Sequence, residues 1–279
     1  VGIELVRRRL RLGITARRLT VATIAATLAL ATFQRGLIFA DQETLYRDVI
    51  DKAPGNARGY LGVGLAQFAR DPRNPGDAEL MFRKAIAADT MSFVSWQSLG
   101  VLQLTQARWQ DAVYTFTRSL RIEPGNLDAI GGMARAYVEL QDANNAMRYV
   151  DQLGGRNIPA LWAIGNLLVR QGRGPEALRY LEVAAASEKP SSLGVALMSL
   201  AYAQSGSVPQ AERAAQVATS AAGDTADVYN LAARAMIAAK RPAAAREYLV
   251  LALALDPNSE TLRKALENLD SLQARRHAQ

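Results

Sequence analysis

Apolar and small residues recur along most of the chain at three- and four-residue spacing, the pattern by which a helix buries one face. Between residues 57 and 257 these helical stretches come in pairs that short turns separate. An alanine stands in the middle of each second stretch, and successive alanines lie 34, 34, 31, 34 and 34 residues apart: Ala78, Ala112, Ala146, Ala177, Ala211 and Ala245. A period of this length predicts six repeated helix pairs over residues 57–257.

Residues 96–124 contain the clearest copy of the repeat. Its key positions are, in order, Trp96, Leu99, Gly100, Ala112, Phe116, Ser119 and Pro124. The copy resembles the tetratricopeptide repeat, in which two antiparallel helices pair and a small residue at position 8 meets a small residue at position 20. The resemblance implies an all-α fold, a right-handed α-solenoid of such helix pairs.

Helical segments are also expected on both sides of the six pairs. Residues 41–56 match the second half of a repeat, with a lone helix over residues 41–52. Residues 258–279 predict a capping helix that opens at Asn258 or Ser259, followed by a loose tail from Arg275. Four leucines of this helix are expected to face inward: Leu262, Leu266, Leu269 and Leu272.

The third unit is irregular. It is three residues short, and Gly154-Gly155 replaces the end of its second helix. A unit shortened in this way should change the curvature of the array or act as a hinge. Loop variation without consequence is the alternative explanation of the same residues.

The stretch from Leu19 to Ala40 has 22 residues, the length that a helix needs to cross about 30 Å of hydrocarbon. It predicts a transmembrane helix over residues 19–40. Small residues at three- and four-residue spacing would let a second membrane helix pack closely, although alanine is also a common filler: Ala22, Ala25, Ala26 and Ala29.

The net charge of +7 is concentrated before and within this stretch. Residues 1–40 carry +6, and the remaining 239 residues carry only +1, so the charge pattern argues against a nucleic-acid binder. The positive-inside rule places the basic segment 1–18 in the cytoplasm and the repeats outside it, in the periplasm or an equivalent space. A cleaved signal peptide, with Ala29-Leu30-Ala31 as its small-x-small site, is the alternative.

The chain has no cysteine and a single histidine, His277. This composition excludes a disulfide framework, a Cys/His zinc site, a thiol nucleophile and a Ser/His/Asp triad. The acidic pair Asp41 and Glu43 is interpreted as helix-capping charge. No catalytic residues, metal ligands or cofactors are predicted, and the protein is not expected to be an enzyme.

In arrays that resemble this one, the concave surface consists mainly of positions 2, 5, 9, 12 and 13 of each first helix. Transferred position by position, the candidate partner-binding residues are Arg58, Gln97, Arg135, Trp162, Asn166, Arg170, Asn230 and Arg234. Their arginine and asparagine side chains suit an extended peptide or its carboxylate. Trp162 is expected either to anchor a partner or to pack against the loop of the short third unit.

Residues 31–66 are similar to the junction between the last membrane helix and the repeats of bacterial polytopic transmembrane-and-tetratricopeptide O-mannosyltransferase-like proteins. Three segments carry the similarity: Gln34-Arg35, Thr44-Leu45-Tyr46-Arg47-Asp48 and Pro54-Gly55-Asn56-Ala57-Arg58. That family keeps its catalytic carboxylates in early loops that this chain does not contain. The sequence thus favours a membrane-anchored scaffold that holds a protein partner on the extracytoplasmic side, as an accessory subunit of a larger membrane complex. The alternative is the substrate-holding region of a lipid-linked-sugar glycosyltransferase.

Overall fold

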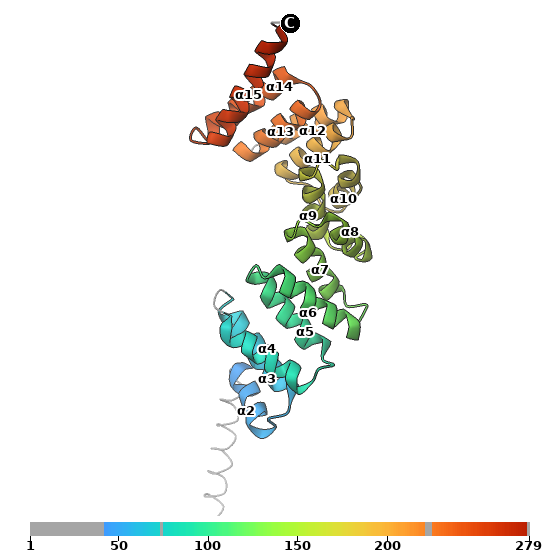
Figure 1. The fold of residues 1–279 in the computed structure, drawn as a ribbon, viewed down its shortest axis with the longest axis vertical. Helices are drawn as coiled ribbons and strands as arrows, with labels where there is room; N and C mark the ends of the chain where they lie inside the picture. Colours follow the sequence, from blue (N-terminus) through green and yellow to red (C-terminus); the bar gives the residue numbers. More distant parts are fainter. Residues whose placement is uncertain (1–41, 73–74, 221–224, 278–279) are drawn as a thin grey trace, which may run out of the picture. The chain divides into compact units, whose positions relative to one another are not determined.

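The computed structural model describes residues 42–72, 75–220 and 225–277, and all regular secondary structure in these ranges is α-helical (Figure 1). The all-α prediction is therefore confirmed for this part of the chain. The predicted basic segment, the transmembrane helix and its packing alanines Ala22, Ala25, Ala26 and Ala29 lie outside these ranges. No helix within them has the length and apolar character needed to span a membrane.

The chain divides into two compact units between Gln106 and Ala107. The first unit contains four helices in its described part: α2 (Gln42–Lys52), α3 (Ala57–Arg70), α4 (Gly76–Ala88) and α5 (Phe93–Thr105). Helices that follow one another in sequence pack against one another. The lone helix expected over residues 41–52 is thus present as α2, and it packs on α3.

The second unit contains the remaining helices of the described chain. They are α6 (Trp109–Ile122), α7 (Leu127–Glu139), α8 (Ala143–Gln152), α9 (Ile158–Arg170), α10 (Gly174–Ser187), α11 (Ser192–Gln204), α12 (Val208–Ser220), α13 (Ala226–Ala238), α14 (Pro242–Leu255) and α15 (Glu260–His277). From α6 to α15 each helix packs on the next, the arrangement of an α-solenoid.

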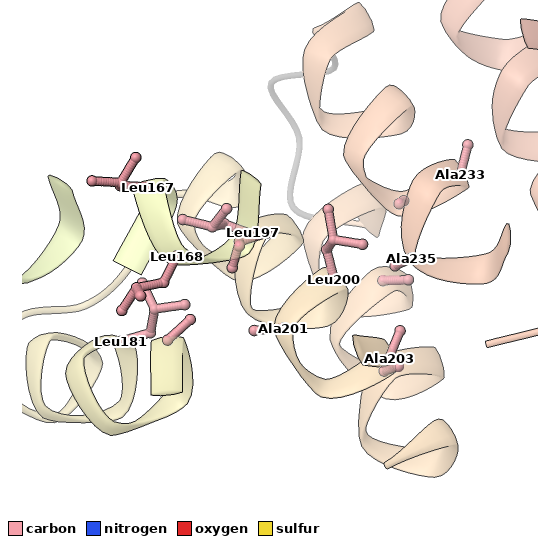
Figure 2. Packing of buried hydrophobic residues seen from close by; sticks show 14 of the residues in the cluster. Leu167, Leu168, Leu181, Leu197, Leu200, Ala201, Ala203, Ala233 and Ala235 are labelled. Atoms are coloured by element: carbon pink, nitrogen blue, oxygen red, sulfur yellow. The ribbon is translucent and has the colours of Figure 1, made fainter. Parts of the chain in front are cut away.

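The six periodic alanines each lie in the second helix of a pair and are at most 1% exposed. One hydrophobic core extends from α7 to α15. Figure 2 shows part of this core, with labels on Leu167, Leu168, Leu181, Leu197, Leu200, Ala201, Ala203, Ala233 and Ala235. In the fifth repeat the Ser199 hydroxyl donates to the carbonyl of Ala211 over 2.7 Å, so positions 8 and 20 meet as the repeat pattern predicts.

Asparagine or serine caps the first helix of five successive repeats. In each case the side-chain oxygen accepts a backbone N–H of the first turn, and the five capping residues are Asn56, Ser92, Asn126, Asn157 and Ser191. These caps satisfy amide groups that have no partner inside the helix. They fix where each repeat begins.

A left-handed residue joins the first helix to the second in several repeats. Gly172 and Gly206 have φ values of 77° and 78°, whereas Gln141 and Lys240 adopt φ of 59° without being glycine. An L-residue in this region pays about 1–2 kcal/mol of steric strain. Glycine therefore supplies the left-handed residue in two of these turns, and residues with side chains tolerate the strain in the other two.

Replacing Lys240 by glycine is expected to stabilise the chain by about 0.5–1 kcal/mol, because glycine removes the strain but has more freedom in the unfolded chain. Lys240→Ala keeps the Cβ atom and should give no gain beyond a few tenths of a kcal/mol. Urea unfolding of the two variants measures the difference. Equal stability of both variants would mean that this turn stores no strain.

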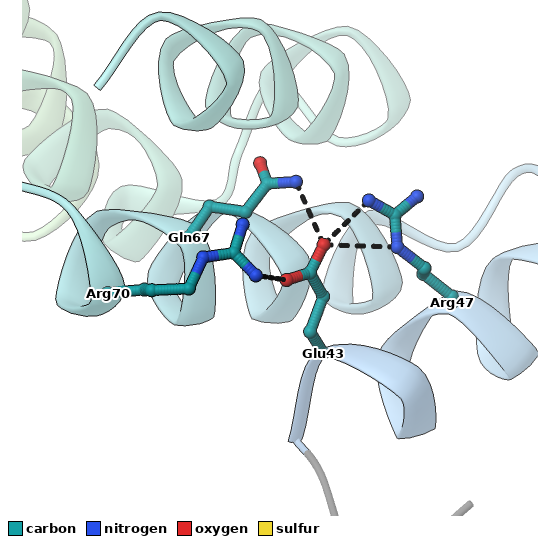
Figure 3. Close-up of polar contacts among 4 residues, drawn as sticks. All are labelled: Glu43, Arg47, Gln67 and Arg70. Atoms are coloured by element: carbon teal, nitrogen blue, oxygen red, sulfur yellow. Dashed lines mark hydrogen bonds and ion pairs between the residues drawn. The ribbon is translucent and has the colours of Figure 1, made fainter. Parts of the chain in front are cut away.

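Glu43 connects α2 to α3 through a cluster of ion pairs in which its own side chain is buried and the two arginines remain exposed (Figure 3). Its carboxylate accepts from Arg47 (Nη2, 2.6 Å), from Gln67 (Nε2, 3.0 Å) and from Arg70 (Nη1, 2.7 Å). The interpretation of Glu43 as helix-capping charge was therefore incomplete, because this side chain fastens the half-repeat to the first full repeat. Tyr46 supports the same contact, since its ring lies where a Cβ atom on Gly62 would be.

The hydrogen bond from Arg47, helped by Gln67 and Arg70, lowers the pKa of Glu43 against the opposing effect of burial. The folded chain thus favours the ionised form. The resulting stabilisation is complete above the ordinary carboxyl pKa and is lost as pH falls through the lowered pKa.

Glu43→Gln should destabilise the α2–α3 contact by about 1–3 kcal/mol at pH 7, because two guanidinium groups lose their carboxylate. The difference from the unchanged protein should shrink as pH falls through the lowered pKa of Glu43. Urea unfolding over a series of decreasing pH values tests this. Glu260→Gln, which removes an exposed pair with Lys264, is the control and should change stability by less than about 1 kcal/mol. An effect of Glu43→Gln that stays constant down to the acid unfolding of the protein would refute the ionic explanation.

The C-terminal helix departs from its prediction in two ways. α15 continues to His277, so the tail expected from Arg275 is largely helical. Leu262 and Leu269 are buried as expected, but Leu272 is 57% exposed.

Candidate functional site

Two adjoining hollows lie on the face formed by the first helices of the second unit. The first hollow has a volume of about 400 Å³ and is lined by Gly131, Ala134, Arg135, Val138, Glu139, Val150, Asn157, Pro159, Ala160 and Ala163. The second has about 330 Å³ and is lined by Trp162, Ala163, Asn166, Ser191, Leu193, Gly194, Leu197 and Leu231. Because Ala163 lines both, the hollows form one groove over α7, α9, α11 and α13.

Trp162 forms one wall of the second hollow. The indole is half-buried, and a Cβ atom on Gly194 would lie 3.1 Å from its Cη2 atom, so the ring rests on the first turn of α11. The indole thus contacts the following repeat. Its remaining surface lines the groove, where an aromatic ring can support a partner.

Asn166 lies one helical turn after Trp162 and is exposed in the same hollow. On α13, Asn230 is half-buried and Arg234 is exposed, and neither lines a hollow. Within the described part of the chain, these three side chains make no hydrogen bond or ion pair. Their amide and guanidinium donors are available to a ligand on this face.

Arg135 and Glu139 lie one turn apart on α7, at the first hollow. Both are exposed, and neither has a hydrogen-bond or ion-pair partner among the residues that the structure describes. Two opposite charges at this spacing often pair along a helix. Here both remain available at the edge of the groove.

Arg170 is already engaged within the protein. Its Nη2 donates to Oε1 of Gln141 over 3.0 Å, and the neighbouring Gln171 donates to the carbonyl of Gln141. These bonds hold the strained turn between α7 and α8. Arg170 therefore stabilises the fold, and a partner that bound its guanidinium group would have to compete with Gln141.

Arg58 and Gln97 belong to the first unit. Arg58 is exposed in the first turn of α3, and Gln97 is half-buried on α5. The structure does not bring them to either hollow. Their role in binding stays a prediction.

A third hollow of about 290 Å³ lies where the short third repeat ends. It is lined by Val150, Asp151, Gly154, Gly155, Leu161, Arg179, Tyr180 and Val183. The Tyr180 hydroxyl donates to Oδ1 of Asp151 over 3.0 Å, and Arg179 donates to the same oxygen. Burial and this hydrogen bond to a carboxylate raise the pKa of Tyr180 to about 12, so the hydroxyl keeps its proton and acts as a structural donor.

The hollows exist because several of their lining residues are small, and the sequence did not predict these residues as part of a site. Ala160, Ala163 and Gly194 leave space that larger side chains would fill. Their signal in the sequence is weak, because alanine and glycine are also frequent at the packing positions of every repeat. Only the placement of one helix against the next distinguishes an alanine that packs from an alanine that leaves a gap.

In the described residues, no group of three side chains that commonly bind metals comes together. The groove instead presents apolar walls, an indole ring, amides and two unpaired charges. Surfaces of this composition bind other molecules by burial and hydrogen bonding.

The comparisons with known proteins agree with this geometry. A family model described as tetratricopeptide repeat matches residues 103–163. No protein of curated function matches the sequence. The fold is that of tetratricopeptide-repeat proteins, as the solved structures show.

Three similar structures illustrate the likeness. YrrB, described as a TPR protein with an unusual peptide-binding site, has a TM-score of 0.58 and 17% identity over 66% of this chain and 95% of its own. PilW, described as a widely conserved type IV pilus biogenesis factor, has a TM-score of 0.58 and 18% identity, over 75% of this chain and 98% of its own. PilF of Pseudomonas aeruginosa has a TM-score of 0.56 and 16% identity, over 76% of this chain and 97% of its own. At these identities the likeness concerns the fold alone.

Proposed function

We propose that the protein is a membrane-anchored scaffold whose repeats bind a protein partner, and that it serves as an accessory subunit of a larger membrane complex. The observation that carries the proposal is the groove of the second unit, in which two hollows adjoin at Ala163. A half-buried indole and unpaired polar side chains line this groove. No group with catalytic chemistry is required for the role.

An extended segment of a partner polypeptide suits the groove best. Its backbone carries N–H and C=O groups at regular spacing, and the Asn166 amide can both donate to and accept from such a backbone. Trp162 offers a rigid apolar surface that costs little conformational entropy to order. YrrB, which has the same fold, is described as having a peptide-binding site. That description supports a peptide ligand for this chain as well.

Membrane anchoring rests on the amino-acid sequence. Residues 19–40 have the length and composition of a transmembrane helix, and the basic residues before them favour a cytoplasmic N-terminus. Because α2 begins at Gln42, the repeats would start directly at the membrane surface on the extracytoplasmic side. Protease added to spheroplasts, in which only the inner membrane remains as a barrier, should then degrade the repeats but not residues 1–18. Protection of the repeats in spheroplasts would refute this topology.

Peptide binding can be tested with a phage-displayed library of random 12-residue peptides, selected on the full chain in a mild detergent. We expect enriched peptides whose binding slows amide hydrogen exchange in α9 and α11. A binding footprint confined to the second helices of the repeats, or a library without any enriched peptide, would refute the proposed groove.

The alternative function is the substrate-holding region of a polytopic lipid-linked-sugar glycosyltransferase. The similarity of residues 31–66 to the membrane–repeat junction of that family favours it. The denatured mass of the natural protein separates the two functions. A mass near 30.2 kDa supports the scaffold, whereas more than twice that mass supports the enzyme.

A further inference from the structure

The junction between the third and fourth repeats differs from the other junctions of the second unit. α8 has 10 residues, whereas α6, α10, α12 and α14 have 13 or 14. The chain leaves α8 through Gly154 and Gly155, whose φ values of 57° and 76° turn it away from a helical path. The second helix of this repeat is therefore about one turn shorter than its counterparts.

Two hollows adjoin this junction. The first hollow and the third hollow share one lining residue, Val150. Val150 is 1% exposed and belongs to α8. The short helix thus contributes a side chain to both hollows.

The first hollow is shaped like a side-chain pocket. Small residues from α7 and α9 line its walls: Gly131, Ala134, Ala160 and Ala163. By contrast, α11 and α13 pack closely, with Leu200 and Ala203 of α11 and Ala233 and Ala235 of α13 in one core (Figure 2). A hollow of about 400 Å³ lies within the size range of ligand pockets, and its walls are mostly apolar.

The unpaired charges at this hollow indicate which part of a peptide crosses it. Glu139 suits a backbone N–H and Arg135 suits a backbone C=O, so together they match the neutral main chain of an internal segment. A terminal carboxylate would meet Arg135 favourably but would be repelled by Glu139 at the adjacent turn. The charge pattern therefore favours an internal segment over a chain end.

We propose that the first hollow is a specificity pocket that accepts one large aromatic side chain from an internal, extended segment of the partner. This pocket lies beside the short helix α8, which contributes Val150 to its lining, and Arg135 and Glu139 bind the main chain on either side of the aromatic residue. Aromatic side chains bury 150–250 Å² each and commonly act as anchors in interface pockets. This inference rests on the proposed function of the groove.

Ala160→Phe tests the pocket because it places a ring inside the first hollow without touching the second. The probes are the peptides selected from the random 12-residue library. We expect most of them to share an aromatic residue, and we expect Ala160→Phe to weaken their binding by at least tenfold. Ala238→Phe, the same change at an exposed site of α13 outside both hollows, should leave affinity within twofold. Circular dichroism verifies that both variants remain helical.

Changing the peptide as well as the protein makes the test independent of folding. Replacing the shared aromatic residue of the peptide by alanine should weaken binding tenfold to the unchanged protein but less than twofold to Ala160→Phe.

The outcomes separate this inference from the function on which it rests. Peptides that bind the groove and depend on Trp162, but share no aromatic residue and tolerate Ala160→Phe, would refute the pocket and leave the proposed function intact. A library without any groove-binding peptide would refute both.

Discussion

Phe116→Ala should destabilise the second unit by about 3–5 kcal/mol, the largest effect expected of any single truncation in its core. The Phe116 ring is fully buried and lies where a Cβ atom on Gly132 would be, with its Cζ atom 2.3 Å from that position. Truncation leaves a ring-sized cavity at the contact between α6 and α7. Chemical denaturation of the full chain measures the loss.

A compensating substitution tests the packing itself. Gly132→Val alone should cost about 1–3 kcal/mol, because its side chain collides with the ring. In the double variant the valine occupies part of the cavity, so the total loss should be smaller than the sum of the two single losses. Additive losses would mean that Phe116 and Gly132 do not pack against each other.

Trp162→Ala should weaken binding of groove-selected peptides by about 30-fold or more, which corresponds to at least 2 kcal/mol for an aromatic anchor. The indole lines the second hollow, and its loss leaves the wall between α9 and α11 incomplete. Isothermal titration of a selected peptide measures the change.

Tyr114→Ala is the matched control for this substitution. Tyr114 is 63% exposed on α6 and lines neither hollow, so its loss should change affinity by less than twofold. If both variants weakened binding equally, the effect would arise from general destabilisation. If neither did, the groove would not be the binding site.

The helical architecture was predictable because the same pattern of apolar and small residues occurs in six copies along the chain. The period of the buried alanines located each second helix, and the residues between them followed from helical spacing. Even the irregular third unit was visible as a spacing of 31 between Ala146 and Ala177. Close packing of position 8 on position 20, seen at Ser199 and Ala211, follows from the same pattern.

The features that escaped prediction depend on contacts between segments or on the absence of a contact. Glu43 binds Arg70 across 27 residues, and nothing local in the sequence of α2 distinguishes it from a capping residue. Leu272 has the correct spacing for burial, but within the described part of the chain it is 57% exposed. The strained turns at Gln141 and Lys240 carry residues that ordinarily avoid positive φ.

The structure shows where the candidate binding residues lie, and their role in binding stays a prediction. Trp162, Asn166 and Arg135 line the hollows, as their repeat positions suggested, whereas Arg170 is bound to Gln141. The pocket at the third repeat was not predicted, because a row of small residues gives no sign of an opening. Its existence depends on how far α7 lies from α9, which is a tertiary property.

Photocrosslinking from single positions tests the central claim most directly. A photoreactive amino acid replaces either Asn166, which lies in the groove, or Arg213, which is exposed on α12 and lines none of the three hollows. Each variant is made in the natural full-length protein and expressed in its own cells. The account predicts one discrete crosslinked protein from Asn166 that competing groove-selected peptide reduces, and none from Arg213. Crosslinks from Arg213 alone, or from both positions without competition, would contradict it.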